Sequence, residues 1–572
     1  MISWQPPLFL HTESGEVPLG SPVAGFCAER RGKESHQGMP MDRQERIENL
    51  SQKELARPAL TSTWWVLVVA LGVQIAFIQK PFHVDDTVVL HIARQILMHP
   101  LNPLSGELDW DGVVKPTFHV TTNPPLLSYY LALWMLLGGE REWVMHAAML
   151  IWQVLLWWGV VLLARRFKVN PALATTLVML NPATIVSPNL MRDVPMVALW
   201  ALGTALFLQG SDTGDSRRMG WGAGMTGCAA LMKYSGLGAI VLLAVYVLLQ
   251  RRARQLGWVL LALLPFALWC VQNLMVHGQL HFWATLQRKD IHTPFSDRLW
   301  GTLAALGGVW LLWLWAGIVC RQRWASALAL MIALAVGWWR WQRFMPAGDV
   351  EAAFWSAAGA FLLVLTLFRA WEVWHEQAFC VLWAAWVLLA IGVGAPFAAA
   401  RHLLPAIPPL ALLWLPEGQW RPGKRLALSA VVAVQAGWGI YTGWCDMQIA
   451  DVYRRGAQLL AKEHGAQAFV GHWGWMYYAQ HAGLQQVSAN RLPPEGTLVA
   501  IPTVGGDAAV PPALVPRLLY EHSVEVIAPA RLATLPPTAG FYASLRGAPP
   551  FRWLPSGYRE QFDLFRVEAG ER

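Results

Sequence analysis

Long apolar runs, separated by short polar and charged clusters, fill most of the chain between residues 63 and 444. A helix needs about 20 apolar residues to cross a bilayer, and about 17 is the lower limit. The run from Pro125 to Leu137 is shorter and is followed by Gly138-Gly139, so we expect a juxtamembrane helix there. The other runs, several of them shorter than ideal, predict about 13 transmembrane helices. These predicted spans cover residues 63–78, 144–164, 172–190, 194–210, 219–235, 237–250, 257–275, 299–319, 325–339, 352–368, 379–397, 402–416 and 426–444.

The basic clusters between these spans all fall on the side of the N-terminus when the juxtamembrane helix is not counted as a span. Loops rich in Lys and Arg face the cytosol, so this side is predicted to be cytosolic. The clusters are Arg165 to Lys168, Arg217-Arg218, Arg251 to Arg254, Arg321 to Arg323, Arg369 and Arg421 to Arg425. The odd number of spans then puts the long loop 80–143 and the C-terminal region on the extracytoplasmic side.

Composition supports a polytopic membrane protein, because 55% of the 572 residues are hydrophobic and only 14% are charged. The 34 Trp residues fit this reading, since indoles collect at membrane interfaces. The net charge of +8 comes largely from the clusters between spans and does not indicate nucleic-acid binding. The six Cys residues lie mostly in apolar runs and show neither a disulfide framework nor zinc-ligand spacing.

The two ends of the chain differ from the apolar part. Residues 1–60 are polar, rich in Gly, Pro and Glu, and lack the apolar core of a signal peptide, which predicts a disordered cytosolic segment with Met39 or Met41 as an alternative start. Residues 61–445 hold the predicted spans. Residues 446–572 alternate helical segments with short β-branched runs between Pro-rich turns, which predicts a small extracytoplasmic α/β domain with a partly parallel sheet.

The C-terminal domain has two open interpretations. It contains no glycine fingerprint for nucleotide phosphates. Its helical segment Ile449 to His464 and its run Leu498 to Ile501 suit a domain that simply packs on the membrane part. The aromatic stretch Gly471 to Tyr478 is either the packed face of a helix or a platform that stacks on an acceptor.

Two adjacent carboxylates, Asp85 and Asp86, follow the first predicted span directly. A charge in hydrocarbon costs roughly 3 kcal/mol or more, so an acidic pair at a helix mouth indicates a functional site. Partial desolvation and the neighbouring charge also raise the pKa of such a carboxyl toward the range of a proton acceptor. The simpler explanation is that the pair caps a surface helix from Thr87 to Met98.

A further acidic residue, Asp193, lies in an outer turn that the topology puts on the same side as Asp85. Separate acidic sites beside cationic side chains suit a phosphate-bearing substrate and a general base. Simpler explanations stay open here too: Asp193 as a helix N-cap with Pro195 in the first turn, and arginines that snorkel at span ends. The cationic candidates are Lys115, Arg192, Lys233 and Arg401.

Histidines offer a weaker hypothesis. His83, His91 and His119 lie near the aspartates in sequence, but their spacing matches no specific metal-ligand pattern. No cofactor is predicted, and a divalent metal stays open.

The order of these features resembles the GT-C glycosyltransferases. The resemblance rests on a first span, the outer Asp85-Asp86 pair, a Pro-Pro-Leu juxtamembrane helix, Asp193 before a span, a Lys233-containing span and the late segment Arg401 to Pro408. Within the superfamily, the similarity is to bacterial relatives of dolichyl-phosphate-mannose protein mannosyltransferases and of lipid A aminoarabinose and galacturonic acid transferases. It covers about residues 60 to 415.

The resemblance implies an integral-membrane enzyme with the catalytic outer loop 80–143, and composition suggests the bacterial inner membrane. Such an enzyme takes a sugar from a polyprenyl-phosphate carrier and transfers it, usually with inversion, to a hydroxyl of a lipid, glycan or protein acceptor. By the resemblance Asp85 is the general base, Asp86 its companion and Asp193 the second-loop aspartate. Arg401 matches the late basic residue.

One departure concerns the carrier phosphate. Several relatives carry Glu-Lys before Pro-Pro-Leu, whereas this chain has Thr122-Asn123, and asparagine supplies no charge. Either Lys115 or Arg192 replaces the lysine, or the donor is held differently. Positioning roles are expected for His83, Asn123, Tyr129 and His402, the last of which stands where an aromatic is usual.

Two other functions stay open from the sequence. One is a transporter or flippase of a lipid-linked or acidic solute, although the chain shows no internal repeat of the kind that transporters have. The other is an inactive family member that acts as an assembly subunit.

Overall fold

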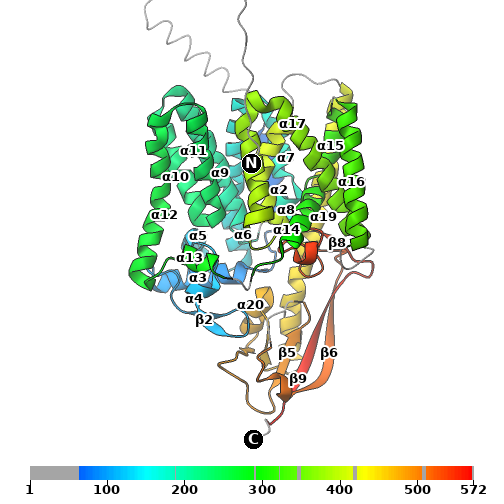
Figure 1. Cartoon of the computed structure of the whole chain (residues 1–572). Coiled ribbons are helices and arrows are strands. Elements are labelled where there is room, and N and C mark those ends of the chain that lie inside the picture. Colours follow the sequence, from blue (N-terminus) through cyan, green and yellow to red (C-terminus); the bar gives the residue numbers. More distant parts are fainter. Residues whose placement is uncertain are drawn as a thin grey trace, which may run out of the picture. The chain divides into compact units, whose positions relative to one another are not determined.

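The computed structural model describes residues 63–186, 189–288, 291–320, 322–343, 349–415, 422–504 and 510–569. Helices dominate this part of the chain, and a small sheet follows near its C-terminal end (Figure 1). The predicted disordered segment 1–60 lies outside the described residues.

Six helices of the described residues are long and apolar enough to cross a membrane, or seven if a bent pair counts as one span. Shorter apolar helices are α2 (Trp64–Ala76), α5 (Leu126–Gly138) and Tyr234–Leu249, which contains α11 (Leu237–Leu249). The prediction of a multi-pass helical protein is supported, whereas the number 13 stays a prediction. The six long segments are Glu142–Arg166 (α6), Asp193–Thr213 (α9), Ala253–His277 (with α12, Leu256–His277), Arg323–Gln342 (in α16, Arg323–Arg343), Val350–Gly394 (with α17, Val350–Leu389) and Pro422–Lys462 (α19).

One predicted span, 172–190, is divided into two short helices. These are α7 (Pro171–Met179) and α8 (Pro182–Val186). Proline lacks the amide N–H that would continue the helix, and the preceding Asn181 is fully buried. The Asn181 side chain donates to the carbonyl of Val309 over 2.9 Å, so the break is anchored to a neighbouring helix.

Two other predictions differ because helices bend. The predicted span 299–319 consists of α14 (Phe295–Val309) and α15 (Leu312–Val319), which are bent by 78°. The two spans predicted on either side of Arg369 correspond to two helices that together form α17 and meet at a kink at Gln377, which has non-helical dihedral angles (φ −127°, ψ 27°). Arg369 lies in the first of these helices, before the kink.

The outer loop 80–143 is folded around three helices and a hairpin. In Figure 1, α3, α4 and α5 lie together at the lower edge of the helical bundle. Ser128 of α5 donates to the carbonyl of Val89 in α3 over 3.0 Å, which fixes α5 to α3. At 13 residues, α5 is shorter than a span, as predicted. The elements of this loop are α3 (Asp86–Met98), β1 (Glu107–Asp109), β2 (Val114–Pro116), α4 (Thr117–Val120) and α5.

The helix α19 crosses the predicted domain boundary at residue 446. Cys445, Ile449 and Val452 are all buried, and their three- and four-residue spacing continues one helical stripe. The predicted helical segment Ile449 to His464 corresponds to the end of this 41-residue helix, which ends at Lys462, so one helix runs through the predicted boundary.

The C-terminal domain contains a five-stranded sheet of order β4-β3-β5-β9-β6. The strand β3 pairs parallel with β4 and β5, whereas β9 pairs antiparallel with β5 and β6. The predicted partly parallel sheet is therefore present, with α19 packed against it (Figure 1). Its elements are β3 (Ala468–Phe469), α20 (Trp473–His481), β4 (Gln485–Gln486), β5 (Leu498–Pro502), β6 (Leu518–Ala528) and β9 (Tyr558–Val567). The strands β7 (Leu532–Ala533) and β8 (Arg552–Trp553) form a separate two-stranded sheet.

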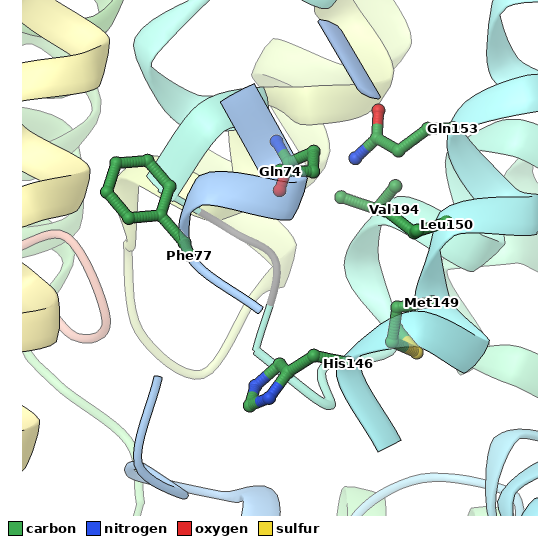
Figure 2. A pocket seen from close by; sticks show the side chains of 7 residues that line it. All are labelled: Gln74, Phe77, His146, Met149, Leu150, Gln153 and Val194. Carbon is green, nitrogen blue, oxygen red and sulfur yellow. The ribbon is translucent and has the colours of Figure 1, made fainter. Parts of the chain in front are cut away.

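A very small cavity inside the helical bundle is lined by three polar and four apolar side chains. Its volume of about 10 Å³ has room for roughly one water molecule. Figure 2 shows Gln74, His146 and Gln153 among the residues around it. Each of these three side chains has a buried atom without a hydrogen-bond partner among the described residues. The cavity fits an internal water and is too small for a substrate.

Candidate active site

Arg401 joins two of the predicted carboxylates. Its Nη2 lies 3.3 Å from Oδ2 of Asp85, and its Nη1 lies 3.3 Å from Oδ2 of Asp193. Lys233 Nζ lies 2.6 Å from the other oxygen of Asp193. These residues, with Arg192 described below, form the Arg401 cluster. Residues separated by up to 316 positions in the chain thus meet at one point.

Close packing of α9 against α10 (Ser216–Met232) places Asp193 beside Lys233. The two helices are consecutive and antiparallel, so the beginning of α9 lies beside the end of α10. Their backbones approach closely at Gly222, where an added Cβ would lie 2.5 Å from the amide nitrogen of Phe207. Lys233 is the C-cap of α10, and its extended backbone turns the chain there.

Arg192 is the cation of the cluster that lacks a full set of partners. It is only 7% exposed, and its Nε and Nη2 have no hydrogen-bond partner among the described residues. Burial lowers the pKa of Arg192 to about 10, although Asp85 and Asp193 act in the opposite direction. The guanidinium is still protonated at neutral pH. Three cations therefore face two carboxylates, and one of the cations can bind an anion.

Asp86 has a different environment from Asp85. It is fully buried, and its two oxygens accept hydrogen bonds of 2.8 Å from the amides of His83 and Leu190. Burial raises the pKa of Asp86 to about 8. The side chain of Asp85, by contrast, is 33% exposed and faces Arg401. Asp86 thus holds together the two loops that carry Asp85 and Arg192, and only Asp85 is open to a substrate.

A second charged cluster, which the sequence analysis did not identify, lies around Asp446 of α19. Lys80 and Asp446 form a fully buried ion pair. Tyr542 donates to Oδ2 of Asp446 over 2.7 Å, and Thr534 donates to Oδ1. His83 lies beside them, with its Nε2 3.7 Å from Oδ1 of Asp446. These five residues form the Asp446 cluster.

The Asp446 cluster is connected to the Arg401 cluster through Tyr542. Asn189 donates to the Tyr542 hydroxyl over 2.5 Å, and Arg401 Nε donates to the Tyr542 carbonyl over 3.3 Å. A sequence feature could have identified this cluster. Lys80 and Asp446 are ionisable residues at the ends of apolar runs, and such positions indicate a buried charge that needs a partner.

Three other candidates make their contacts outside the Arg401 cluster. Lys115 pairs with Asp111 over 2.5 Å in the β1–β2 region and is about half-exposed. Tyr129 donates to the carbonyl of Pro100 over 2.5 Å. Asn123 donates over 3.1 Å to the hydroxyl of the preceding threonine. Among the two cations proposed to replace the missing lysine, Arg192 is therefore the one beside Asp85.

His402 follows Arg401 in a 3₁₀ helix, Ala400–Ala406. Its ring contacts Phe397 with a centroid distance of 5.3 Å, and it is close enough to Asp193 and Lys233 to feel their charges. His402 therefore lies beside the Arg401 cluster.

The histidines considered for a metal lie apart from one another. His83 is beside Asp446, and His91 Nε2 lies 3.1 Å from the hydroxyl of Thr117. The ring of His119 contacts Phe118. Among the described residues, no group of three or more His, Cys, Asp or Glu side chains is placed to hold a metal ion.

Comparison with known proteins gives this geometry a family context. Residues 122–276 match the family described as dolichyl-phosphate-mannose-protein mannosyltransferase. This match confirms the resemblance to GT-C glycosyltransferases. The chain is a multi-pass membrane protein similar to these enzymes, and the similarity supports transferase activity.

Two solved structures are similar to the chain at low identity. ArnT from Cupriavidus metallidurans, bound to undecaprenyl phosphate, is 18% identical, with a TM-score of 0.39 over 87% of this chain and 97% of that chain. Arabinofuranosyltransferase AftD from Mycobacteria is 14% identical, with a TM-score of 0.36 over 89% of this chain and 40% of that chain. No curated protein matches the chain.

The stretch that matches the mannosyltransferase family contains only part of the Arg401 cluster. Arg192, Asp193 and Lys233 lie within residues 122–276, whereas Asp85 precedes that stretch and Arg401 follows it. The fold brings these outer residues to the matched part.

Proposed function

We propose that the chain transfers a sugar from a polyprenyl-phosphate-linked donor to an acceptor hydroxyl at the extracytoplasmic face of a bacterial inner membrane. The observation that carries the proposal is the partly exposed carboxylate of Asp85 beside the incompletely bonded guanidinium of Arg192. A general base and an anion-binding cation are the two groups that this reaction needs. The matched family is named for a mannosyl phosphate carried on dolichol, which supports a lipid-linked donor.

In the proposed reaction, Asp85 accepts the proton of the acceptor hydroxyl. The hydroxyl oxygen bonds to the anomeric carbon while the bond from that carbon to the phosphate oxygen breaks. Attack opposite the leaving group inverts the anomeric configuration. The electron pair of the broken bond leaves with the polyprenyl phosphate, whose added negative charge Arg192 and Arg401 stabilise. No nucleotide is consumed, because the lipid phosphate is the leaving group.

The remaining charged residues of the Arg401 cluster have supporting roles in this proposal. Asp193 is 2% exposed and accepts contacts from both Lys233 and Arg401, so it positions these cations and does not serve as the base. Asp86 positions the backbone on either side of Asp85. In this proposal Arg192, and not Lys115, contacts the carrier phosphate, because Lys115 pairs with Asp111 in the β1–β2 region.

The proposed orientation follows the charge pattern of the sequence. The N-terminus is cytosolic, and the loop 80–143 and the C-terminal domain are extracytoplasmic. The carrier's isoprenoid tail then stays in the lipid while its phosphate reaches Arg192. A reporter fused near Arg217 should accordingly give a cytosolic signal.

The test compares release of sugar from a panel of radiolabelled polyprenyl-phosphate sugars in membranes that contain wild type or Asp85→Asn. Loss of a general base reduces turnover by about 10²- to 10⁴-fold. The matched control is Asp111→Asn, because Asp111 is a half-exposed aspartate of the same outer loop. Wild-type turnover by Asp85→Asn, at equal expression, contradicts the assignment of the base. Movement of a lipid-linked sugar across the membrane of vesicles, without any sugar release, would contradict the enzyme function and indicate a flippase.

A further inference from the structure

A polar cleft of about 560 Å³ lies between the outer loop and the C-terminal domain. One wall is a face of α3, where Thr87, His91 and Arg94 follow a spacing of four and three residues. The second wall is the β1–β2 hairpin, and the third comprises α20, β4 and the turn that follows β4. The hairpin and the C-terminal domain are joined by a hydrogen bond of 2.8 Å from the amide of Ala489 to the carbonyl of Gly112.

The cleft lining is rich in groups that both donate and accept hydrogen bonds. Four amide side chains face it, and each offers two N–H donors and one carbonyl acceptor. Tyr477 adds an aromatic surface to the same wall. Two of the amides are already connected, because Gln480 donates to Oε1 of Gln486 over 3.1 Å and Gln486 donates to the carbonyl of Asp109 over 3.1 Å. Such a connected polar lining matches the closely spaced hydroxyls of a sugar better than it matches a lipid tail. The four amides are those of Gln480, Gln485, Gln486 and Asn490.

One lining residue has an unfilled hydrogen-bond position. Asp109 is 8% exposed, and its Oδ1 accepts from the amide of Gly112 over 2.8 Å. Its Oδ2 is buried and has no hydrogen-bond partner among the described residues. A buried carboxylate oxygen without a donor is costly, so a shift of the Asp109 side chain toward a ligand hydroxyl in the cleft would supply the missing donor.

The helix α3 connects Asp85 with the cleft. Asp85 occupies the N-cap position of α3, where its side chain makes no capping hydrogen bond, and Thr87, in the first turn of that helix, lines the cleft. Next to Asp109, Trp110 stacks on His472 with ring centroids 4.9 Å apart. Burial lowers the pKa of His472 to about 4, and the nearby charge of Asp85 acts in the opposite direction. The wall from Asp109 to His472 therefore leads toward the proposed base.

We propose that this cleft binds the saccharide portion of the acceptor and directs one of its hydroxyls toward Asp85. The proposal rests on the transferase function above and selects a sugar-bearing acceptor over a purely protein or aliphatic one. It gives the C-terminal domain a part in acceptor recognition through Tyr477 and the amides. Trp475, in contrast, is fully buried and donates to the carbonyl of Val470 over 2.9 Å, so it belongs to the domain core.

The first arm of the test measures equilibrium binding of fluorescently tagged oligosaccharides to the full chain in lipid nanodiscs. The panel contains neutral hexose, uronic acid and amino sugar oligosaccharides. The double variant Gln480→Ala/Asn490→Ala changes two exposed amides of the cleft and should bind the preferred saccharide at least about tenfold more weakly, as the loss of two hydrogen bonds implies. The control Gln561→Ala removes an exposed amide on β9, outside the cleft lining, and should bind like wild type.

The second arm measures donor turnover with and without the saccharide that binds. The double variant should raise the acceptor KM about tenfold and leave slow release of the donor sugar to water unchanged. Wild type that binds none of the three saccharide classes, or a double variant that binds as tightly as wild type, overturns the cleft proposal. A wild type that binds a saccharide in the cleft but releases no sugar from any donor contradicts the proposed function and leaves the cleft as a saccharide site.

Discussion

The Asp446 cluster and the Arg401 cluster are both built from buried charges, but they differ in how completely those charges are bonded. Asp446 is fully buried and both of its oxygens have partners, while Lys80 beside it is 2% exposed. In the Arg401 cluster, a third of the Asp85 side chain is exposed and two nitrogens of Arg192 have no partner among the described residues. The fully bonded Lys80–Asp446 ion pair fits a structural role, although both ring nitrogens of the adjacent His83 have no hydrogen-bond partner among the described residues. The incompletely bonded Arg401 cluster fits a ligand site.

The largest effect that separates the clusters is expected from Lys80→Met. This change leaves the buried Asp446 without its cation, and removal of one partner of a buried ion pair costs about 3–5 kcal/mol. The measurement is the free energy of unfolding of the purified full chain in detergent. The control Lys115→Met breaks an exposed pair and should cost less than about 1 kcal/mol. Equal stability of wild type and Lys80→Met would contradict the structural role.

Arg192→Ala is expected to change donor binding and not stability, which is the opposite of Lys80→Met, and the effect is smaller. Because its Nε and Nη2 bond to nothing among the described residues, the free energy of unfolding should hardly change. The donor KM should rise, since a hydrogen bond to a charged group contributes about 1.5–3 kcal/mol, or roughly 10- to 150-fold. Arg192→Lys keeps the charge and should recover part of the affinity. A fall in the free energy of unfolding with an unchanged donor KM would show that Arg192 has a structural role and does not bind the donor.

The smallest effect concerns the unpaired oxygen of Asp109 in the cleft. Burial raises the pKa of Asp109 to about 6, so the carboxyl gains its negative charge as the pH rises through that value. The charged form is the better acceptor, and saccharide binding should strengthen a few-fold between about pH 5 and about pH 7. Burial lowers the pKa of His91 in the same cleft to about 4, so His91 stays neutral over this interval.

The check on this effect is the dissociation constant of the tagged saccharide at both pH values in wild type and Asp109→Asn. The other charged groups around Asp109 are Asp111, Lys115, Glu107, Arg94 and Arg491. They are retained in the variant, so loss of the pH dependence identifies Asp109 as its source. An unchanged pH dependence in Asp109→Asn would show that another group carries it.

Local sequence signals were sufficient to find much of the Arg401 cluster. Asp85 and Asp193 stand where apolar runs reach the outer side, and the high energy of a charge at such positions makes them conspicuous. The same signal is present at Lys80 and Asp446, but only the fold shows that these two distant charges form a pair. Asp85 and Asp86 are adjacent in sequence, so no local pattern distinguishes them. Only the fold shows that the carboxylate of Asp85 is partly exposed and that of Asp86 is buried.

The sequence by itself determined the apolar helices, the short juxtamembrane helix α5 and the change of character in the C-terminal region, since these follow from local hydrophobicity and chain length. The tertiary structure alone decided which charges meet. Arg401 and Asp85 are 316 positions apart, and Lys80 and Asp446 are 366 apart. Such pairs depend on how helices pack, as for α19, which runs through residue 446 and carries Asp446 to Lys80. Bends and helix packing depend on contacts between distant segments, which no local pattern of polar and apolar residues specifies.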